Sequence, residues 1–337
     1  VFYSADKSST LMMIQFSESS ASTRTMDAIK SIKSLLNKHC FFSGMSAIIT
    51  DTKDLTDSEA PKYIAIAVVL ALIALSFTMD SWVLPLVLLI SLGYAIVYNL
   101  GTNFFMPNGI SYITQSIAAI LQLGVTMDYS VFLMDRFNEE QKVTPDRTEA
   151  MTNAISSTFI SLAGSSLTTV FGFLALCFMS LTLGFDIGIV MAKGVLLGVL
   201  TVVVVLPSFL LLFYKPIYRF RHKRFLPNLS RLNAFIINHR KVFAIIFLIL
   251  IIPSYIAKSL VPLDYVASNA LPDSLDSVQS LAKLKNDFNM ATTHFIIFDN
   301  DVPSGQVSEM IDEFEAVDGV SNVISLMFLS PFSYLYK

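Results

Sequence analysis

Six long apolar segments constrain this chain more than any other feature of its sequence. They cover residues 62–79, 82–100, 112–134, 154–180, 184–214 and 242–260. Because a helix rises about 1.5 Å per residue, roughly twenty apolar residues cross the hydrocarbon layer of a bilayer. Hydrophobic residues make up 54% of the chain and charged residues only 15%, which is well below the charged content of a typical soluble domain. The sequence therefore predicts an all-α membrane bundle of six transmembrane helices.

Basic residues indicate which connections between these segments face the cytoplasm. The connection 101–111 has no Lys or Arg, whereas 215–241 has eight, namely Lys215, Arg219, Arg221, Lys223, Arg224, Arg231, Arg240 and Lys241. Cytoplasmic connections are enriched in Lys and Arg. We therefore expect 215–241 to be cytoplasmic in a multi-pass protein of the cell membrane. Counting spans from there places residues 1–60 and 261–337 outside the cytoplasm.

The two ends of the chain have a mixed, more polar pattern that is typical of α+β domains. The pattern predicts strands at Ser9–Phe16, Met45–Thr50, Thr292–Phe298 and Val320–Leu326, and helices at Ser22–His39, Asp273–Asn289 and Ser304–Ala316. Neither end resembles a natural terminus, and residues 1–19 lack the charged and apolar regions of a signal peptide. We interpret the sequence as an internal part of a longer protein.

The expected domain order follows from these patterns. Residues 1–60 form the C-terminal part of a first extracytoplasmic domain, and 261–337 form the start of a second. Between them lie a five-helix transmembrane bundle at 61–214, a basic cytoplasmic connection at 215–241 and a sixth transmembrane helix at 242–260.

Asp128 is the carboxylate that lies inside an apolar segment rather than at its end. An ionised carboxylate near the bilayer centre costs about 2.5–3.5 kcal/mol on insertion scales, so such residues usually have a function. Gly124, one helical turn earlier, would let another helix approach. Tyr129 shares a helical stripe with Gln122 and Thr126. The pattern favours a titrating group in ion coupling; the alternative is a static hydrogen bond or a permanently neutral carboxyl.

The next apolar segment has a stripe of small and hydroxyl residues. Thr158, Ser161, Ser165, Thr168 and Gly172 recur at spacings of 3, 4, 3 and 4, and the stripe is widened by Ser157, Gly164, Ser166 and Thr169. Such a face could bring hydroxyl partners or ordered water to Asp128, with Thr168 and Thr169 as the preferred candidates. The alternative is close helix packing alone, for which Gly164, Ser165 and Gly172 are suited.

Lys193 is the basic residue that lies deep in an apolar segment, and Gly194 follows it as a further helix-packing candidate. Lys193 either pairs with Asp128, which would make it a relay residue, or extends its ammonium towards the membrane surface. The sequence leaves both alternatives open.

Several other classes of site have no support in the sequence. The two cysteines, Cys40 and Cys177, lie in a polar and an apolar segment and predict no disulfide. The four histidines have no ligand spacing, so no metal site or cofactor is expected. No basic stretch has the length or context of a nucleic-acid site.

The order of domains and motifs resembles the middle of a resistance-nodulation-division (RND) transporter, and within that superfamily the MMPL (mycobacterial-membrane-protein-large-like) branch. The motif G-x-x-x-D-Y-x-x-F stands here as Gly124, Asp128, Tyr129 and Phe132, followed by RFNEE at 136–140. The segment SLTTVFGFLAL at 166–176 and the later G-x-x-x-A-K-G, with Lys193 and Gly194, are also similar to that family.

The resemblance implies a secondary active transporter, not an enzyme, that uses the proton motive force to export lipids or other hydrophobic or amphiphilic molecules. Asp128 and Tyr129 would belong to its proton relay, whereas Lys193 is not part of the widely shared relay. Membrane lipids, protons and a second half with a matching Asp-Tyr pair would be its partners. Both end domains would be porter-like, and formation of a homo-oligomer stays open.

Two other functions remain as alternatives at this point. One is a non-pumping lipid- or sterol-sensing receptor, or a protein-export accessory, of the same architecture. The other is an intramembrane aspartyl protease, which needs two aspartates that share a proton. Asp128 is the one deep aspartate of this sequence, so the protease is the weakest of the three hypotheses.

Overall fold

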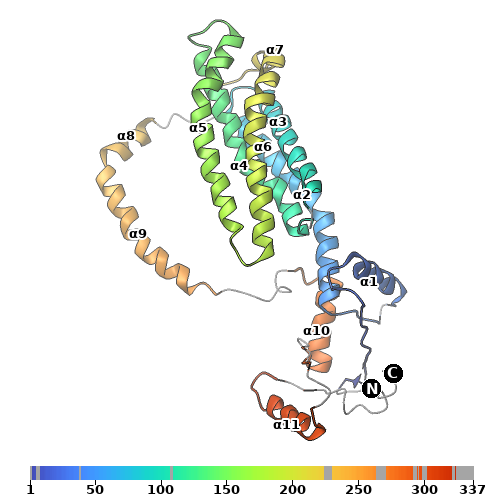
Figure 1. Ribbon diagram of the computed structural model, residues 1–337. Coiled ribbons are helices and arrows are strands. Elements are labelled where there is room, and N and C mark those ends of the chain that lie inside the picture. The colour runs from blue at the N-terminus through green and yellow to red at the C-terminus, as the bar shows by residue number, and fades with distance from the viewer. Residues whose placement is uncertain are drawn as a thin grey trace. The chain divides into compact units, whose positions relative to one another are not determined.

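The computed structural model describes residues 2–4, 8–37, 39–106, 109–223, 230–262, 271–290, 294, 296–297, 302–320 and 323 (Figure 1). The chain divides into two compact units. One unit combines residues 1–52 with 263–337, and the other comprises residues 53–262. Each unit is described by itself.

The described residues contain six helices that are long and apolar enough to cross a membrane, as the sequence predicted. They are α2 (Met45–Thr78), α3 (Leu84–Gly101), α4 (Tyr112–Glu140), α5 (Arg147–Leu176), α6 (Thr182–Leu212) and α9 (Arg240–Leu260). A short 3-10 helix, η1 (Thr102–Phe105), continues α3. Two further helices, α7 (Tyr214–Arg219) and α8 (Ser230–Asn238), follow α6.

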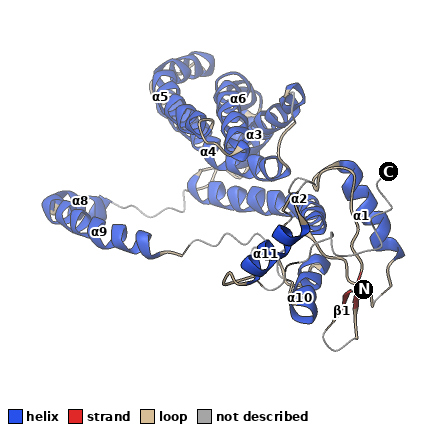
Figure 2. Ribbon diagram, turned by 60° about the horizontal axis from the view of Figure 1, so that its bottom comes forward, coloured by secondary structure: helices blue, strands red, loops and turns tan. Residues whose placement is uncertain are grey.

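Helix α6 is the centre of the larger unit, because it contacts α3, α4 and α5. Figures 1 and 2 show these four helices side by side. Glycines on α6 permit the close approach: a Cβ on Gly188 would lie 2.7 Å from the carbonyl oxygen of Phe173 on α5. A Cβ on Gly198 would lie 2.6 Å from Cγ2 of Thr126 on α4. Small residues at helix crossings are the usual basis of packing between membrane helices.

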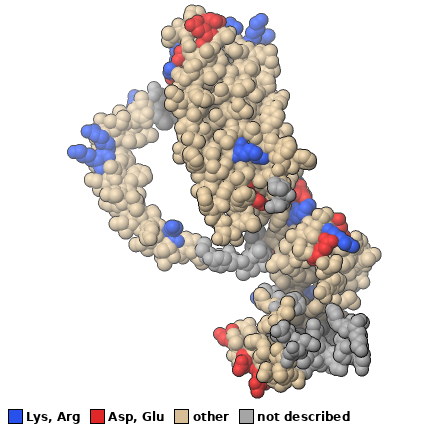
Figure 3. All heavy atoms as spheres, viewed as in Figure 1, with Lys and Arg blue, Asp and Glu red and all other residues tan. Residues whose placement is uncertain are grey.

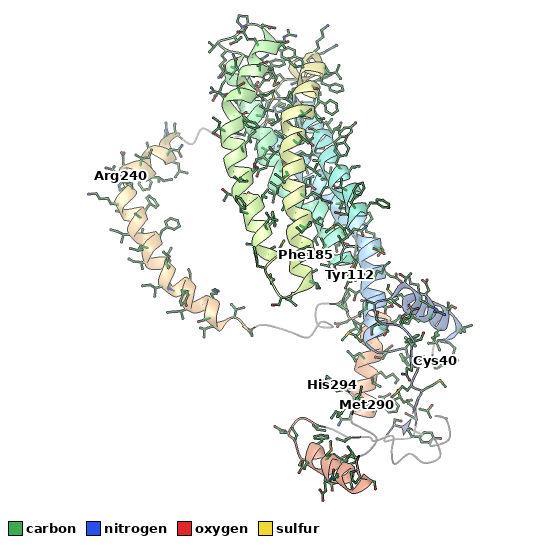
Figure 4. All side chains as sticks on the ribbon, viewed as in Figure 1. Cys40, Tyr112, Phe185, Arg240, Met290 and His294 are labelled. Atoms are coloured by element: carbon green, nitrogen blue, oxygen red, sulfur yellow. The ribbon has the colours of Figure 1, made fainter. Side chains whose placement is uncertain are left out.

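Charged side chains lie mainly at the ends of this bundle. We call the end that holds residues 79–83, residues 141–146 and α7 the basic end. Figure 3 shows charged residues gathered there, at the top of the view, whereas the visible side of the bundle has few. At the opposite end, Asp186 Oδ2 accepts a hydrogen bond of 3.0 Å from the backbone N–H of Ser111. Figure 4 labels their neighbours Phe185 and Tyr112 at that end.

The smaller unit is mostly helical. It contains α1 (Thr23–Leu35), α10 (Asp276–Phe288) and α11 (Ser304–Glu315), and it begins with the antiparallel pair β1 (Phe2–Tyr3) and β2 (Thr10–Leu11). The helices predicted at Ser22–His39, Asp273–Asn289 and Ser304–Ala316 are therefore confirmed, with shorter bounds.

Asp51, in the first turns of α2, joins the two ends of the chain within this smaller unit. Its Oδ1 accepts a hydrogen bond of 2.5 Å from Lys33 Nζ on α1, and its Oδ2 accepts one of 3.1 Å from the backbone N–H of Ser277 on α10. The segment before the first candidate span and the segment after the last one are therefore in contact within this unit.

The predicted strands of the smaller unit need correction. Met45–Thr50 is not a strand but the first turns of α2, in which Ala47 and Thr50 are buried at the helical spacing of three residues. Of the predicted strand Ser9–Phe16, only Thr10–Leu11 pairs as a strand. Thr292–Phe298 and Val320–Leu326 lie largely outside the described residues, and those of their residues that are described are not strand. The structure therefore does not show the α+β porter-like domains.

Candidate functional site

Asp128 and Tyr129 lie on different faces of α4. Tyr129 is only 6% exposed and belongs to the main hydrophobic core, whereas Asp128 is exposed. Adjacent residues on a helix project about 100° apart, so one side chain can enter the bundle while the next leaves it. Gly124, one turn before Asp128, is also exposed. The carboxylate therefore lies on the outer surface of the described bundle.

Within the described part of the chain, Asp128 has no hydrogen-bond or ion-pair partner, and the predicted contacts to it are not seen. The Thr168 hydroxyl donates to the carbonyl oxygen of Gly164 at 3.0 Å, and the Thr169 hydroxyl donates to that of Ser165 at 3.1 Å. Both bonds lie within α5. The hydroxyl oxygens keep their capacity to accept a further hydrogen bond.

The polar stripe of α5 divides between two surfaces. Thr158 and Ser166 are 1% and 5% exposed and point into the bundle. We call the exposed part of the stripe the small-residue face of α5. It comprises Ser161, Gly164, Ser165, Thr168 and Gly172. A Cβ on Gly124, Gly164 or Gly172 would meet no described atom within 4 Å. These glycines are thus not used for packing between the described helices.

Arg136 connects α4 to α5 near the basic end. Its Nε donates to Ser157 Oγ at 2.9 Å, and its guanidinium forms ion pairs with Glu139 at 2.9 Å and Glu140 at 2.8 Å. The charged residues of the RFNEE segment therefore form one local cluster, because Glu139 and Glu140 lie three and four residues after Arg136 on the same helix.

Lys193 lies in a polar network about a third of the way along α6 and does not contact Asp128. Its ammonium donates to the backbone carbonyl of Asn99 at 2.9 Å and to Oδ1 of Asn103 at 2.6 Å. Asn99 Nδ2 donates to Gln122 Oε1 at 2.9 Å, and Gln122 Nε2 donates to the carbonyl oxygen of Gly194 at 3.0 Å. Asn99 and Gln122 are 0% exposed.

Gly194 is the predicted packing residue that the structure does place in a tight contact. A Cβ at this position would lie 2.6 Å from Asn99 Nδ2 and 3.2 Å from the Gln122 amide. Sequence reasoning missed Asn99 and Asn103. The signal that could have indicated them is two asparagines four positions apart, one at the end of the second apolar segment and one just after it.

A second polar cluster joins the helices at the basic end. The Arg221 guanidinium forms an ion pair with Asp80, in the turn after α2, and lies 5.1 Å from the centre of the Tyr218 ring. Tyr218 stacks on Tyr214 with their ring centres 4.2 Å apart, and Arg147 of α5 lies 3.8 Å from the centre of the Tyr214 ring. This cluster connects α7 to the turn after α2 and to the start of α5.

Tyr218 is also bound to the end of α4, since its hydroxyl donates to Gln141 and lies 3.3 Å from Asn138 Oδ1. Burial, and after it the neighbouring Tyr214, raises the pKa of Tyr218 from its ordinary value of 10.0 to about 12. The folded state therefore favours the neutral phenol.

This raised pKa predicts how stability depends on pH. The contribution of Tyr218 is fully present below pH 10, where the phenol is neutral in folded and unfolded states, and it is lost as the pH rises through about 12. We expect the wild-type protein to melt at a higher temperature than Tyr218→Phe below pH 10, and this difference to shrink between pH 10 and about 12. Melting curves of both proteins in detergent measure it. A difference that is constant over this range would contradict the prediction.

The described residues contain two cysteines that do not pair with each other. Cys40 and Cys177 are free thiols. No group of three or more His, Cys, Asp or Glu side chains there could hold a metal ion.

Comparison with known proteins decides the family of this chain. The model of the MMPL family matches residues 1–232, which include α2 to α7, Asp128 and Lys193. The chain belongs to the MMPL family. It is therefore a multi-pass membrane protein of a transporter family, as the resemblance of its motifs implied.

Individual relatives are similar over parts of this MMPL protein. The Streptomyces coelicolor protein SCO0839 is 31% identical over 182 residues, which are 52% of this chain and 26% of the relative. ActII-3 from the same organism is 32% identical over 135 residues, or 39% of this chain and 19% of the relative. MJ1562 of Methanocaldococcus jannaschii is 27% identical over 118 residues, or 35% and 30% of the two chains. All three names describe membrane proteins, and this chain spans no more than about a third of their lengths.

Proposed function

We propose that this MMPL protein is part of an exporter that is driven by the proton motive force and carries lipids or other hydrophobic or amphiphilic molecules across the cell membrane. Asp128 carries the proposal. It lies about 24 Å along α4 from Tyr112 and about 18 Å from Glu140, so it is inside the span. Residues 1–60 and 261–337 are placed outside the cytoplasm in this proposal, as the charge pattern predicts.

The proposed mechanism follows from the cost of charge in hydrocarbon. A carboxylate without a partner there is stabilised by taking up a proton, whereas ionisation requires water or a polar partner. Proton uptake and release at Asp128 would therefore be coupled to which groups cover this part of α4. Thr168 and Thr169 of α5 offer hydroxyl oxygens, whereas the phenol of Tyr129, at the next position of α4, faces the interior of the bundle.

The exposed glycines support a partner for this surface. Gly124 on α4 and the small-residue face of α5 would let another membrane helix approach closely. The resemblance to RND transporters implies that a second half of the protein, with its own Asp-Tyr pair, supplies that helix. The relatives extend well beyond the region that matches this chain. A change in the charge of Asp128 would then bias the packing of the two halves and move the outer domains.

The test is whether transport by the full-length protein requires a proton gradient. Membrane vesicles that contain the protein are loaded with the fluorescent amphiphile Nile red, and its efflux is followed after a pH gradient is imposed. We expect efflux that stops when a protonophore collapses the gradient, and vesicles without the protein are the control. Efflux that does not respond to the gradient would instead favour a non-pumping lipid- or sterol-sensing protein, or a protein-export accessory, of the same architecture.

A further inference from the structure

The network around Lys193 forms a closed ring of hydrogen bonds through three helices. It runs from the ammonium of Lys193 on α6 to the carbonyl of Asn99 on α3, from the amide of Asn99 to Gln122 on α4, and from the amide of Gln122 back to the carbonyl of Gly194 on α6. Since Lys193 and Gly194 are consecutive, the path returns to its starting point. The three bonds that cross between helices measure 2.9, 2.9 and 3.0 Å.

This ring holds α3, α4 and α6 in a fixed arrangement. The side chains of Asn99 and Gln122 are fully buried in a span, where a polar group without a partner is costly, so breaking the bond between their two amides would leave a buried donor and a buried acceptor unpaired. Gly194 leaves no space for a side chain between the two amides. Lys193 adds a bond of 2.6 Å to Asn103 in η1, so it also holds the end of α3.

The ring controls α4 through Gln122. Gln122 and Tyr129 are seven residues apart, which is about two helical turns, so they share one face of α4. Both are buried, and Thr126 between them is buried as well, with its methyl group in the space that Gly198 leaves. A rotation of α4 that moved Tyr129 out of the bundle would have to pull Gln122 out of the ring.

We propose that Lys193 is a positioning residue, which acts with Asn99 and Gln122 to set the rotation of α4 so that Tyr129 faces the bundle and Asp128 faces outward. This inference rests on the proposed function for its importance in transport, but the positioning of α4 by the ring can be tested separately. The ring differs from an ion pair between Lys193 and Asp128, because it requires the amide of Gln122 as much as the charge of Lys193.

The experiment measures how fast dicyclohexylcarbodiimide labels Asp128 in the full-length protein in membranes, with the modified peptide quantified by mass spectrometry. This reagent reacts with protonated carboxyls in apolar surroundings. We expect Lys193→Met and Gln122→Leu each to slow the labelling of Asp128 several-fold, because a freed α4 lets water reach the carboxylate. The double variant should be no slower than either single one, since both open the same ring.

Two controls separate positioning from charge and from misfolding. Lys193→Arg keeps a hydrogen-bond donor and the positive charge, so Asp128 in this variant should be labelled nearly as fast as in the wild type. Gln122→Asn is too short to span Asn99 and Gly194 but remains a buried amide, so it replaces Gln122→Leu if that variant does not yield folded protein. Slow labelling in Lys193→Met with a wild-type rate in both Gln122 variants would overturn the proposal in favour of a simple charge effect. Unchanged rates in all variants would overturn it as well.

The efflux assay on Asp128→Asn, run beside the labelling experiment, distinguishes this result from a failure of the proposed function. If Asp128→Asn leaves gradient-driven efflux intact, the relay is excluded, whereas the labelling rates still report whether the ring positions α4. If efflux is lost in Asp128→Asn but the ring variants label like wild type, the relay stands and the positioning role of Lys193 is rejected.

Discussion

Asparagine in place of Asp128 is expected to abolish gradient-driven efflux by the full-length protein without loss of folded protein in the membrane. Asparagine has nearly the same size but cannot take up or release a proton. The site should tolerate it structurally, because Asp128 is exposed and has no partner among the described residues whose bond would be lost. The measurement is the rate of Nile red efflux per amount of protein that elutes as a single species in detergent.

Asp135→Asn is the matched control for this prediction. Asp135 is seven residues after Asp128, on the same face of α4 and two turns closer to the basic end, and it is partly exposed. The same substitution there should leave efflux close to wild type. Normal efflux in Asp128→Asn would exclude the relay, and equal losses in both variants would show that the effect is not specific to Asp128.

Alanine in place of Gly198 is expected to destabilise the bundle by about 1–3 kcal/mol, the usual cost of inserting a methyl group into a packed core. The added Cβ would lie 2.6 Å from Cγ2 and 3.0 Å from Cβ of Thr126. Thr126 cannot easily turn aside, because its hydroxyl is bound to the carbonyl of Gln122 at 2.7 Å. The measurement is the midpoint of thermal unfolding in detergent.

Thr126→Ser provides the rescue for Gly198→Ala. Serine lacks Cγ2 but keeps the hydroxyl that binds Gln122, so the double variant should recover most of the lost stability. Gly93→Ala on α3 is the control, because its Cβ would meet no described atom within 4 Å and alanine favours a helix by up to about 1 kcal/mol over glycine. Equal destabilisation by Gly198→Ala and Gly93→Ala would contradict the role of this contact.

The pattern of apolar residues was enough to predict the number and order of the spans. The thickness of the hydrocarbon layer sets a minimum length for a spanning helix, and every residue in it must be compatible with lipid or with a packed interior. That requirement acts on each segment separately, so it can be recognised without knowing its neighbours. The motif around Asp128 and Tyr129 likewise predicted the family that the match to residues 1–232 confirmed.

Short apolar runs outside the spans were less informative. Met45–Thr50 has the composition of a strand, but six residues cannot distinguish a strand from a buried turn of helix by periodicity alone. In the structure it continues directly into the first span as part of α2. The strand predicted at Ser9–Phe16 is reduced to the two paired residues Thr10–Leu11, and the residues after them form neither helix nor strand.

The sequence by itself determined that this chain has six segments long and apolar enough to cross a membrane and a carboxylate within the third of them, because both features depend only on composition along one helix. Which polar residues meet was decided by the tertiary structure alone. Asn99, Gln122 and Lys193 are far apart in the chain, and their hydrogen bonds depend on how α3, α4 and α6 are rotated against one another. For the same reason Gly194 and Gly198 lie in tight contacts, whereas Gly124, Gly164 and Gly172 face outward.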